Sequence, residues 1–408
     1  MKSKLQLIGS SYIYILIFLG ILSAFGPFIT DMYLPTLPSM AQIFNTSTAQ
    51  VQLGLTTSLI GLAIGQVFLG PLSDKYGRKS ILFISLIIFS IASIGCILTD
   101  SIYLFNFYRF FQGLGGAGGI VLSRSIATDC YHGKALASTL AIIGAINGIM
   151  PVIAPVTGGF VAGIFGWQGI FVALLAVGII LIGLSLPFEE SLPSEKRNAG
   201  NVFSIFKSYP VLFKNHKFVY CVFIFTFTYG VLFSYISSSS FIVEKHYSYS
   251  EFFFSLTFGV NAIAMAIGSG FVLKLKSLAR SVLGGTLGIT IITLLQIIFY
   301  FSFDNFYIYE GLTFIMAFLL GMIFTATSAM GMEEGRAHSG AASAMLGTFG
   351  YMFGGIVSPI VGMGNIMISY IIVILVCSLM TVVFSYRYLR QIEKLSGSVS
   401  SDIQPRRL

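Results

Sequence analysis

VQLGLTTSLIGLAIGQVFLGPLSDKYGRKSILFISLIIFSIASIGCILT, the sequence of residues 51–99, decides the fold class of this chain. Two long apolar runs flank the segment DKYGRK at residues 74–79, which carries every charged residue of the stretch. A bilayer core about 30 Å thick requires roughly 20 apolar residues in each spanning helix. Each run is therefore long enough for one membrane helix, and the charged segment forms a short loop between them.

The rest of the chain follows the same pattern. Of its 408 residues, 56% are hydrophobic and only 9% are charged, whereas soluble proteins have about 25% charged residues. Runs without Asp, Glu, Lys, Arg or His cover residues 5–30, 32–73, 80–99, 135–188, 218–243, 252–273, 281–303, 311–332 and 339–386, and Arg109 alone interrupts a further run at 101–123. The runs at 135–188 and 339–386 can each form two helices joined by a neutral hairpin. The first run is too long for a cleaved signal core. We predict an all-α membrane protein with about twelve transmembrane helices.

Basic residues gather on one side of this predicted membrane protein. With both the N and C termini in the cytoplasm, nearly all Lys and Arg residues fall in cytoplasmic loops, as the positive-inside rule requires. The predicted outer loops hold one lysine and five acidic residues: Lys245, Asp100, Glu244, Glu251, Asp304 and Glu310. The net charge of +8 therefore reports membrane topology, and we expect no nucleic-acid partner.

An internal repeat divides the chain into two halves. The basic loop at 74–79 recurs at 274–280, and the double-length run that begins at 135 recurs from 339, so the offset is about 200 residues each time. Such repeats are typical of secondary transporters. We predict two pseudo-symmetric six-helix bundles at residues 1–188 and 217–392, joined by a cytoplasmic linker at 189–216 and followed by a cytoplasmic tail at 393–408. A short amphipathic segment is expected at 202–213 within the linker.

The loop between the second and third predicted helices carries a family motif. GPLSDKYGRK at residues 70–79 closely resembles the cytoplasmic signature of the major facilitator superfamily, whose plan is two six-helix halves. The resemblance implies a lock of the outward-facing state. It would consist of Gly70, Asp74, Gly77 and Arg78, joined by Asp129 at the end of the fourth helix. The alternative interpretation is a basic loop that only sets topology. The matching loop of the second half lacks the Asp and the Gly-Arg-Lys sequence, so we assign the lock to the first half.

Arg109 is the most informative single residue, because it lies within a predicted membrane helix. An arginine there costs at least about 2.5 kcal/mol on insertion scales and is normally kept for a transport pathway or an ion pair. Counting inward from Asp100 at about 1.5 Å per residue places Arg109 in the outer half of the membrane. Asp31, at the outer end of the first helix, lies at a compatible depth. It is also the only carboxylate near a membrane run that is not plainly in a loop.

The segments around these two residues carry a closer resemblance. DMYLP at residues 31–35 and RFFQG at residues 109–113 resemble motifs of bacterial drug/proton antiporters, specifically the Bcr/CflA branch, which exports bicyclomycin, chloramphenicol and related compounds. The resemblance implies that Asp31 takes up the proton and that Arg109 tunes its proton affinity. Some related exporters have a second acid earlier on the first helix, where this chain has Ser23. The alternative interpretation is that Asp31 caps a helix or lies in the outer loop.

Two glycine-rich segments follow along the chain. Residues 144–159 are similar to the family's antiporter motif, with Ala154 in place of its first glycine, and the motif favours export. Its residues here are Gly148, Pro151, Pro155, Gly158 and Gly159. Prolines are also tolerated in membrane helices for ordinary packing, which is the alternative interpretation. Residues 113–118 satisfy GxGxxG, but no strand precedes them, so we assign them to close helix packing and not to nucleotide binding.

Polar or flexible residues inside apolar runs are the best candidates for substrate contacts, because a pocket for amphipathic ligands needs a few hydrogen-bonding groups among apolar walls. The candidates are Asn147, Met150, Tyr229, Tyr235 and Asn261. Ordinary packing or interhelical hydrogen bonding explains each of them equally well.

We therefore predict a secondary active transporter and not an enzyme. The chain has no HExxH, no GxSxG and no Walker sequence, and its four histidines are isolated. We expect no cofactor and no metal, with a proton gradient as the energy source. The predicted protein is a functional monomer in the bacterial inner membrane that exports small amphipathic drugs by alternating access. The main rival within transport is proton-driven export of an endogenous metabolite such as a siderophore, sugar or amino acid; a channel is a further class.

Overall fold

The computed structural model describes residues 9–131, 133–197, 209–335 and 339–402, and within these ranges it contains helices and no strand. The α-helices are α1 (Gly9–Ser23), α2 (Phe25–Asp31), α3 (Leu37–Ile43), α4 (Thr48–Tyr76), α5 (Arg78–Leu98), α6 (Ile102–Cys130), α7 (Gly133–Ser185), α8 (Tyr209–Lys214), α9 (His216–Phe241), α10 (Glu251–Phe271), α11 (Leu278–Ser302), α12 (Phe306–Glu334), α13 (Ser339–Val361) and α14 (Ile366–Asp402). Short 3₁₀ turns lie at Leu34–Thr36, Ser194–Lys196 and Val272–Lys274, and a π-helical turn lies at Ile242–His246.

The described helices account for the predicted transmembrane segments. Ten spans of the described residues are long and apolar enough to cross a membrane. Helix α6 has 29 residues and includes Arg109 and a glycine-rich stretch, which lower its hydropathy. Helix α7 is broken at Gly166, where φ is 69°, so it consists of two helices. With α6 and the first segment of α7, the all-α fold of twelve transmembrane helices is confirmed, including the hairpins predicted within 135–188 and 339–386.

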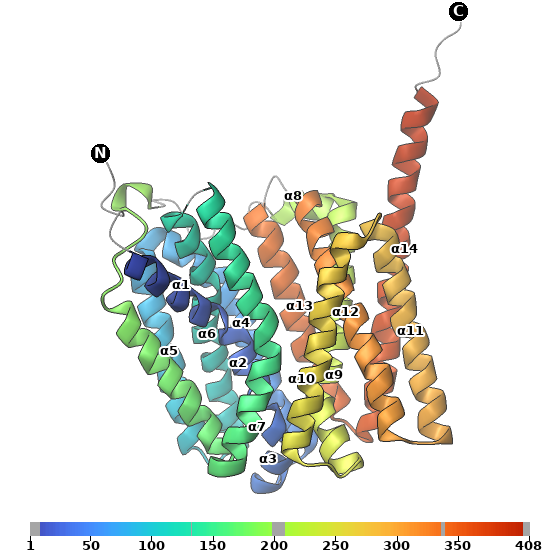
Figure 1. The fold of residues 1–408 in the computed structure, drawn as a ribbon, viewed down its shortest axis with the longest axis horizontal. Coiled ribbons are helices and arrows are strands. Elements are labelled where there is room, and N and C mark those ends of the chain that lie inside the picture. The colour runs from blue at the N-terminus through green and yellow to red at the C-terminus, as the bar shows by residue number, and fades with distance from the viewer. Residues whose placement is uncertain (1–8, 132, 198–208, 336–338, 403–408) are drawn as a thin grey trace, which may run out of the picture. The chain divides into compact units, whose positions relative to one another are not determined.

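The described chain forms two compact units. Unit 1 comprises Met1–Ser204, Ile236–Gly259 and Ser358–Met363, and unit 2 comprises Ile205–Tyr235, Val260–Val357 and Gly364–Leu408. In unit 1, α4 and α5 lie beside α6, and in unit 2, α11 lies beside α12 and α14 (Figure 1). Part of the predicted linker, residues 198–208, and the end of the predicted tail, residues 403–408, lie outside the described residues. So does most of the predicted amphipathic segment, of which α8 is described.

Glycines bring the backbones of α4 and α6 into direct contact. A Cβ added to Gly61 would collide with the backbone of Phe110, and one added to Gly113 would collide with the backbone of Ser58. Gly115 has the backbone of α5 on its other side, with a Cβ falling 2.6 Å from the carbonyl oxygen of Ser85. Small residues allow such close approach in membrane helices. The GxGxxG segment therefore serves helix packing, as predicted.

In unit 2, glycines bring the backbones of α10 and α12 into the same kind of close contact. A Cβ on Gly268 would collide with the backbone carbonyl of Phe318, and one on Gly321 would collide with that of Met265. The repeat that the charge pattern indicated thus extends to the way in which corresponding helices pack.

The first membrane span is divided into short helices, and this division positions Asp31. Helix α1 ends at Ser23, α2 ends at Asp31, and a 3₁₀ turn containing Pro35 precedes α3, which has Pro38 near its start. Proline lacks a backbone N–H and cannot continue a regular helix through its own position. The side chains of this interrupted segment are largely buried, so Asp31 lies inside unit 1.

Candidate functional site

Arg109 lies at the centre of a buried polar cluster in unit 1. Its side chain, on α6, is 0% exposed. Nη2 donates to the backbone carbonyl of Ile29 at 2.7 Å and to the hydroxyl of Ser58 at 3.2 Å. Nε donates to the carbonyl of Gly54 at 3.4 Å, and Nη1 donates to Oε1 of Gln112. Arginine has five N–H donors and no acceptor, so these neutral oxygens satisfy most of its hydrogen-bonding capacity.

Aromatic rings and a second polar layer surround the guanidinium. Its central carbon lies 4.2 Å from the ring centroid of Tyr33 and 5.7 Å from that of Phe171, which is the geometry of cation–π attraction. Behind it, Nε2 of Gln112 donates to the hydroxyl of Ser93 at 2.8 Å, and both side chains are buried. The positive charge is therefore stabilised by oriented dipoles and π faces.

Asp31 lies in the same unit and is 5% exposed. Its Oδ1 accepts a hydrogen bond from the hydroxyl of Thr30 at 2.7 Å. Burial excludes the interpretation that Asp31 stands in an outer loop. A carboxylate that is removed from water with one neutral donor is poorly compensated, and burial favours its protonated form.

The expected contact between Asp31 and Arg109 is not formed in this structure. Among the residues that the structure describes, neither side chain takes part in an ion pair. The physical reason is that the guanidinium already donates to neutral oxygens, one of which is the carbonyl of Ile29, two residues before Asp31. The carboxyl and the guanidinium thus belong to one local framework without neutralising each other.

The predicted lock residues Asp74, Arg78 and Asp129 meet at the junction of α4, α5 and α6. Nε of Arg78 donates to Oδ2 of Asp129 at 2.9 Å, and Nη1 of Arg78 donates to the hydroxyl of Ser73 at 2.7 Å and to Asp74. Arg78 is 7% exposed. Gly70 lies on α4 near Val121, with a Cβ falling 3.3 Å from that side chain. Asp74, Arg78 and Asp129 therefore form one connected network.

Glu190, just after α7, joins this network and was missed by the sequence analysis, which placed it in the linker. Its carboxylate accepts from the backbone N–H of Arg78 at 2.8 Å and of Lys79 at 3.2 Å, and so satisfies free donors at the start of α5. Gly77, with φ at 99°, turns the chain at this point, and a Cβ there would collide with Glu190. The adjacent acidic residues Glu189 and Glu190, directly after a membrane run, could have indicated such a contact. Sequence alone does not show which of the two carboxylates contacts the start of α5.

The residues of the predicted antiporter motif lie on α7. A Cβ on Gly158 would collide with the backbone carbonyl of Met32, and one on Gly159 would collide with the hydroxyl of Ser255 on α10. Pro155 is buried and helical dihedrals continue through it, whereas the chain breaks at Gly166. The side chains of Asn147 and Pro151, and the surroundings of Gly148, lie outside the part of the chain whose side chains are described. Gly158 therefore contacts the segment that follows Asp31, whereas Gly159 contacts α10.

The structure separates the predicted substrate contacts. Met150 is half-buried on α7 in unit 1. Tyr235 and Asn261 touch in unit 2, where the Nδ2 atom of Asn261 donates to the Tyr235 hydroxyl oxygen at 3.0 Å. Tyr229, also in unit 2, lies in an aromatic cluster. Its ring centroid is 4.9 Å from that of Phe324, 5.2 Å from Phe225, 5.3 Å from Tyr351 and 5.7 Å from Phe233.

The structure also places Ser23, and it changes one further expectation, which concerns Glu310. Ser23 is 2% exposed and donates to the backbone carbonyl of Gly20 at 2.8 Å, so its hydroxyl is satisfied within its own helix. Glu310 was placed in an outer loop, but it lies within α12, and its Oε1 accepts from Nδ2 of Asn261 at 2.8 Å. The expectation that Asp31 is the only membrane carboxylate is therefore wrong.

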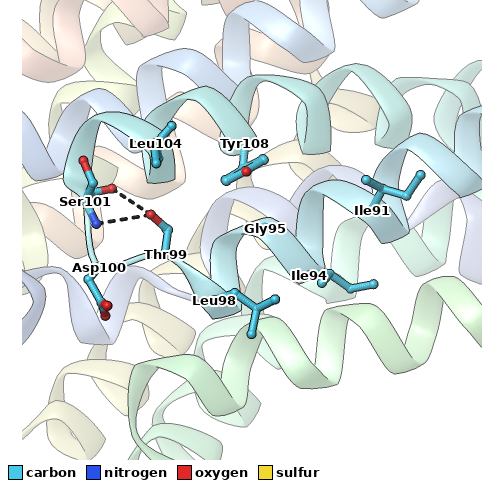
Figure 2. A pocket seen from close by; sticks show the side chains of 9 residues that line it. All are labelled: Ile91, Ile94, Gly95, Leu98, Thr99, Asp100, Ser101, Leu104 and Tyr108. Carbon is cyan, nitrogen blue, oxygen red and sulfur yellow. Dashed lines mark hydrogen bonds between the residues drawn. The ribbon is translucent and has the colours of Figure 1, made fainter.

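A groove of about 630 Å³ lies between the end of α5 and the start of α6 (Figure 2). Leu98 and Leu104 on its walls are 74% and 51% exposed, as expected of side chains that face lipid. Thr99 and Ser101 hydrogen-bond to each other at the turn. Apart from these residues and Asp100, the groove is lined by Ile91, Ile94, Gly95 and Tyr108. No predicted site residue lines it, so we do not assign it to the substrate.

Comparison with known proteins gives the family. Residues 16–359 match the profile of the Major Facilitator Superfamily. The chain is 33% identical to the MFS-type transporter YdgK of Bacillus subtilis, over 88% of this chain and 90% of that protein. It is 31% identical to the bicyclomycin resistance protein homolog of Haemophilus influenzae, over 64% of this chain and 65% of that protein.

Solved structures agree on the fold. A bacterial homolog of the human lysosomal transporter Spinster, solved in an inward-facing and occupied conformation, superposes with a TM-score of 0.76 at 17% identity, covering 93% of this chain and 97% of that chain. Members of this family are membrane transporters. The family resemblance found in the motifs is thus confirmed, and the chain belongs to the major facilitator superfamily.

Proposed function

We propose that this chain is a proton-coupled antiporter that exports small amphipathic compounds, including drugs of the chloramphenicol and bicyclomycin type, by alternating access. Its place is the bacterial inner membrane, with both termini in the cytoplasm, and it acts as a monomer. The name of the Haemophilus influenzae relative, a bicyclomycin resistance protein homolog, supports this substrate class. The antiporter motif around Gly158 supports export over import.

The observation that carries the proposal is the buried carboxyl of Asp31 at the end of α2, the helix whose Ile29 carbonyl accepts a hydrogen bond from the buried and separately satisfied Arg109. Without a cationic partner, the protonated form of Asp31 is favoured inside the protein. If the guanidinium exchanges one of its neutral acceptors for the carboxylate, the proton is released. Proton uptake and release then follow from which partner Arg109 holds, and the two conditions alternate during the transport cycle.

The test uses purified protein in liposomes with an imposed pH gradient. Chloramphenicol-like, sulfonamide-like and cationic compounds are supplied in turn, and proton counterflow is measured. Asp31→Asn keeps the size of the side chain but cannot release a proton. We expect it to abolish gradient-driven transport while substrate exchange without a gradient persists. Asp100→Asn, the same change at an exposed position, serves as the matched control.

Full gradient-driven transport by Asp31→Asn would contradict the coupling scheme. Proton counterflow with none of the drug-like compounds would favour the alternative cargo, an endogenous metabolite exported by the same proton machinery.

A further inference from the structure

A second carboxylate that lies within a helix, half-buried, is found in unit 2. Glu310 is about one turn into α12, where its Oε1 accepts a hydrogen bond from Nδ2 of Asn261 at 2.8 Å. The same Nδ2 atom donates to the hydroxyl oxygen of Tyr235 at 3.0 Å. The three side chains come from α12, α10 and α9, so three helices converge on one polar point. We call Tyr235, Asn261 and Glu310 the unit 2 carboxylate site.

The unit 2 carboxylate site is rich in hydrogen-bond acceptors. The contact with a carboxylate fixes the Asn261 amide with its nitrogen toward Glu310, because an ionised carboxylate can only accept. Asn261 is 2% exposed, and its Oδ1 has no hydrogen-bond partner among the described atoms. No ion pair of Glu310 occurs within the described part of the chain. When Glu310 is ionised, the site therefore presents a negative charge and a free carbonyl oxygen, with no ion-pair partner among the described residues.

Such a set of groups is complementary to a cation that carries N–H donors. Buried polar atoms are nearly always hydrogen-bonded, and an unpaired buried acceptor is unfavourable. A proton on Glu310 removes the charge and provides one O–H donor, but the Asn261 oxygen stays unsatisfied while the amide nitrogen faces Glu310. An ammonium group has three donors, enough to bridge the carboxylate and the amide oxygen together. A proton and an ammonium group thus compete for one carboxyl group.

The charge of this site is opposite to that of the buried polar cluster around Arg109 in the first half of the repeat. Helices α10 and α12 correspond to α4 and α6 of the first half, because Gly268 contacts the backbone of Phe318 as Gly61 contacts that of Phe110. Ser58 contacts the guanidinium of Arg109 in unit 1. The matching helices therefore hold a cation in unit 1 and an anion in unit 2, which ordinary packing does not require.

We propose that Tyr235, Asn261 and Glu310 bind the primary ammonium group of cationic amphipathic substrates. This inference rests on the proposed export function and specifies a substrate class for it. Glu310 provides the charge, the amide oxygen of Asn261 accepts a second N–H, and Tyr235 holds the amide in place. Uncharged substrates gain nothing from the carboxylate, so the site discriminates by charge and by hydrogen-bond donors.

The experiment measures equilibrium binding to the purified full-length protein by fluorescence titration. The probes are dansylcadaverine, a fluorescent primary amine, and its N-acetylated form, which has the same aromatic group but no charge. We expect the wild type to bind the amine at least tenfold more tightly than the acetylated form. Glu310→Gln should lose this preference and keep its affinity for the acetylated form. Glu195→Gln, the same change at an exposed position, should leave both affinities unchanged.

Two further variants distinguish a direct effect on amine binding from a general loss of folding. Glu310→Asp keeps the charge but withdraws it by one methylene group, so an intermediate preference is expected. Asn261→Ala removes the amide oxygen and should weaken amine binding without changing the affinity for the acetylated probe. A graded series would support direct contact with the ammonium group.

Equal affinity of the wild type for both probes would overturn the inference, as would a full preference in Glu310→Gln. A lower melting temperature in Glu310→Gln with an unchanged affinity ratio would assign Glu310 to structure alone and would overturn it too. This test is separate from that of the proposed function, because it needs no gradient and Asp31→Asn should keep the amine preference. A failed coupling scheme and a failed binding site therefore give different results.

Discussion

Nη2 of Arg109 donates a hydrogen bond to the backbone carbonyl of Ile29 at 2.7 Å, which ties the guanidinium to the segment that ends in Asp31. This contact joins a fully buried positive charge to the helix that carries the buried carboxyl of Asp31, without pairing the two charges. The contact also makes the arginine sensitive to any movement of α2. A change in the backbone around Ile29 frees donors for another acceptor, and the nearest acidic group along the chain is Asp31.

The first prediction concerns the shape of the guanidinium. Arg109→Lys keeps the charge but replaces a planar fork by a point charge with three donors. The acceptors around Arg109 come from four residues, so at least one hydrogen bond to a charged group is lost, at about 1.5–3 kcal/mol. We expect gradient-driven transport to fall at least about tenfold, since about 1.4 kcal/mol corresponds to a factor of ten.

The measurement is the initial rate of substrate uptake into proteoliposomes under an imposed pH gradient. Arg124→Lys on the same helix is the matched control, because Arg124 is exposed. Equal rates for Arg109→Lys and the wild type would show that charge alone is sufficient and that the fork geometry has no role.

Much of the fold could be predicted from the sequence because the bilayer imposes a one-dimensional rule. Every spanning helix must avoid charge over roughly 20 residues, so the apolar runs mark the helices directly. The hairpin inside the run at 135–188 was predicted from its length alone, and the structure breaks α7 at Gly166. The short helices around Asp31 were not predicted, because the run length does not reveal how prolines divide a span.

The candidate site could be predicted only in part. Arg109 was identified because a charged side chain in a membrane helix is energetically unfavourable and is therefore normally kept for a function. Glu190 and Glu310 were missed because both lie next to helix ends, where sequence alone assigns a carboxylate to a solvated loop. Whether such a side chain points into the protein depends on the neighbouring helices. The carboxylate of Glu310, for example, accepts a hydrogen bond from Asn261 on α10. Tertiary packing fixes that direction, and no local pattern encodes it.

The second prediction concerns the cap on α5. Glu190→Gln removes the charge and leaves one acceptor oxygen for the two N–H groups of Arg78 and Lys79. Loss of a helix cap typically lowers stability by about 0.5–2 kcal/mol. We expect a lower thermal unfolding temperature and slower gradient-driven transport, because the cap holds the start of α5 beside the motif network.

Glu189→Gln is the matched control for this change, since Glu189 is the adjacent residue and is exposed. Thermal unfolding of the two purified variants is compared with the wild type in the same detergent. If both variants unfold at the same temperature, the contacts of Glu190 with the start of α5 contribute nothing to stability.

The third prediction concerns the contact between α4 and α6. Gly113→Ala adds a methyl group that collides with the backbone of Ser58, so the two helices must separate locally. Overpacking of this kind typically costs about 1–3 kcal/mol. Because the hydroxyl of Ser58 accepts from Arg109 at 3.2 Å, the separation also lengthens a contact of the buried guanidinium. Both the unfolding temperature and the transport rate should therefore fall.

Gly183→Ala on α7 separates this effect from a general effect of replacing glycine, because a Cβ at Gly183 meets no atom within 4 Å. Alanine has the higher helix propensity by about 1 kcal/mol, so Gly183→Ala should be neutral or slightly stabilising. Unfolding temperatures and transport rates are measured for both variants side by side. If Gly113→Ala behaves like Gly183→Ala, the two helices have room to adjust, and Arg109 does not depend on their close contact.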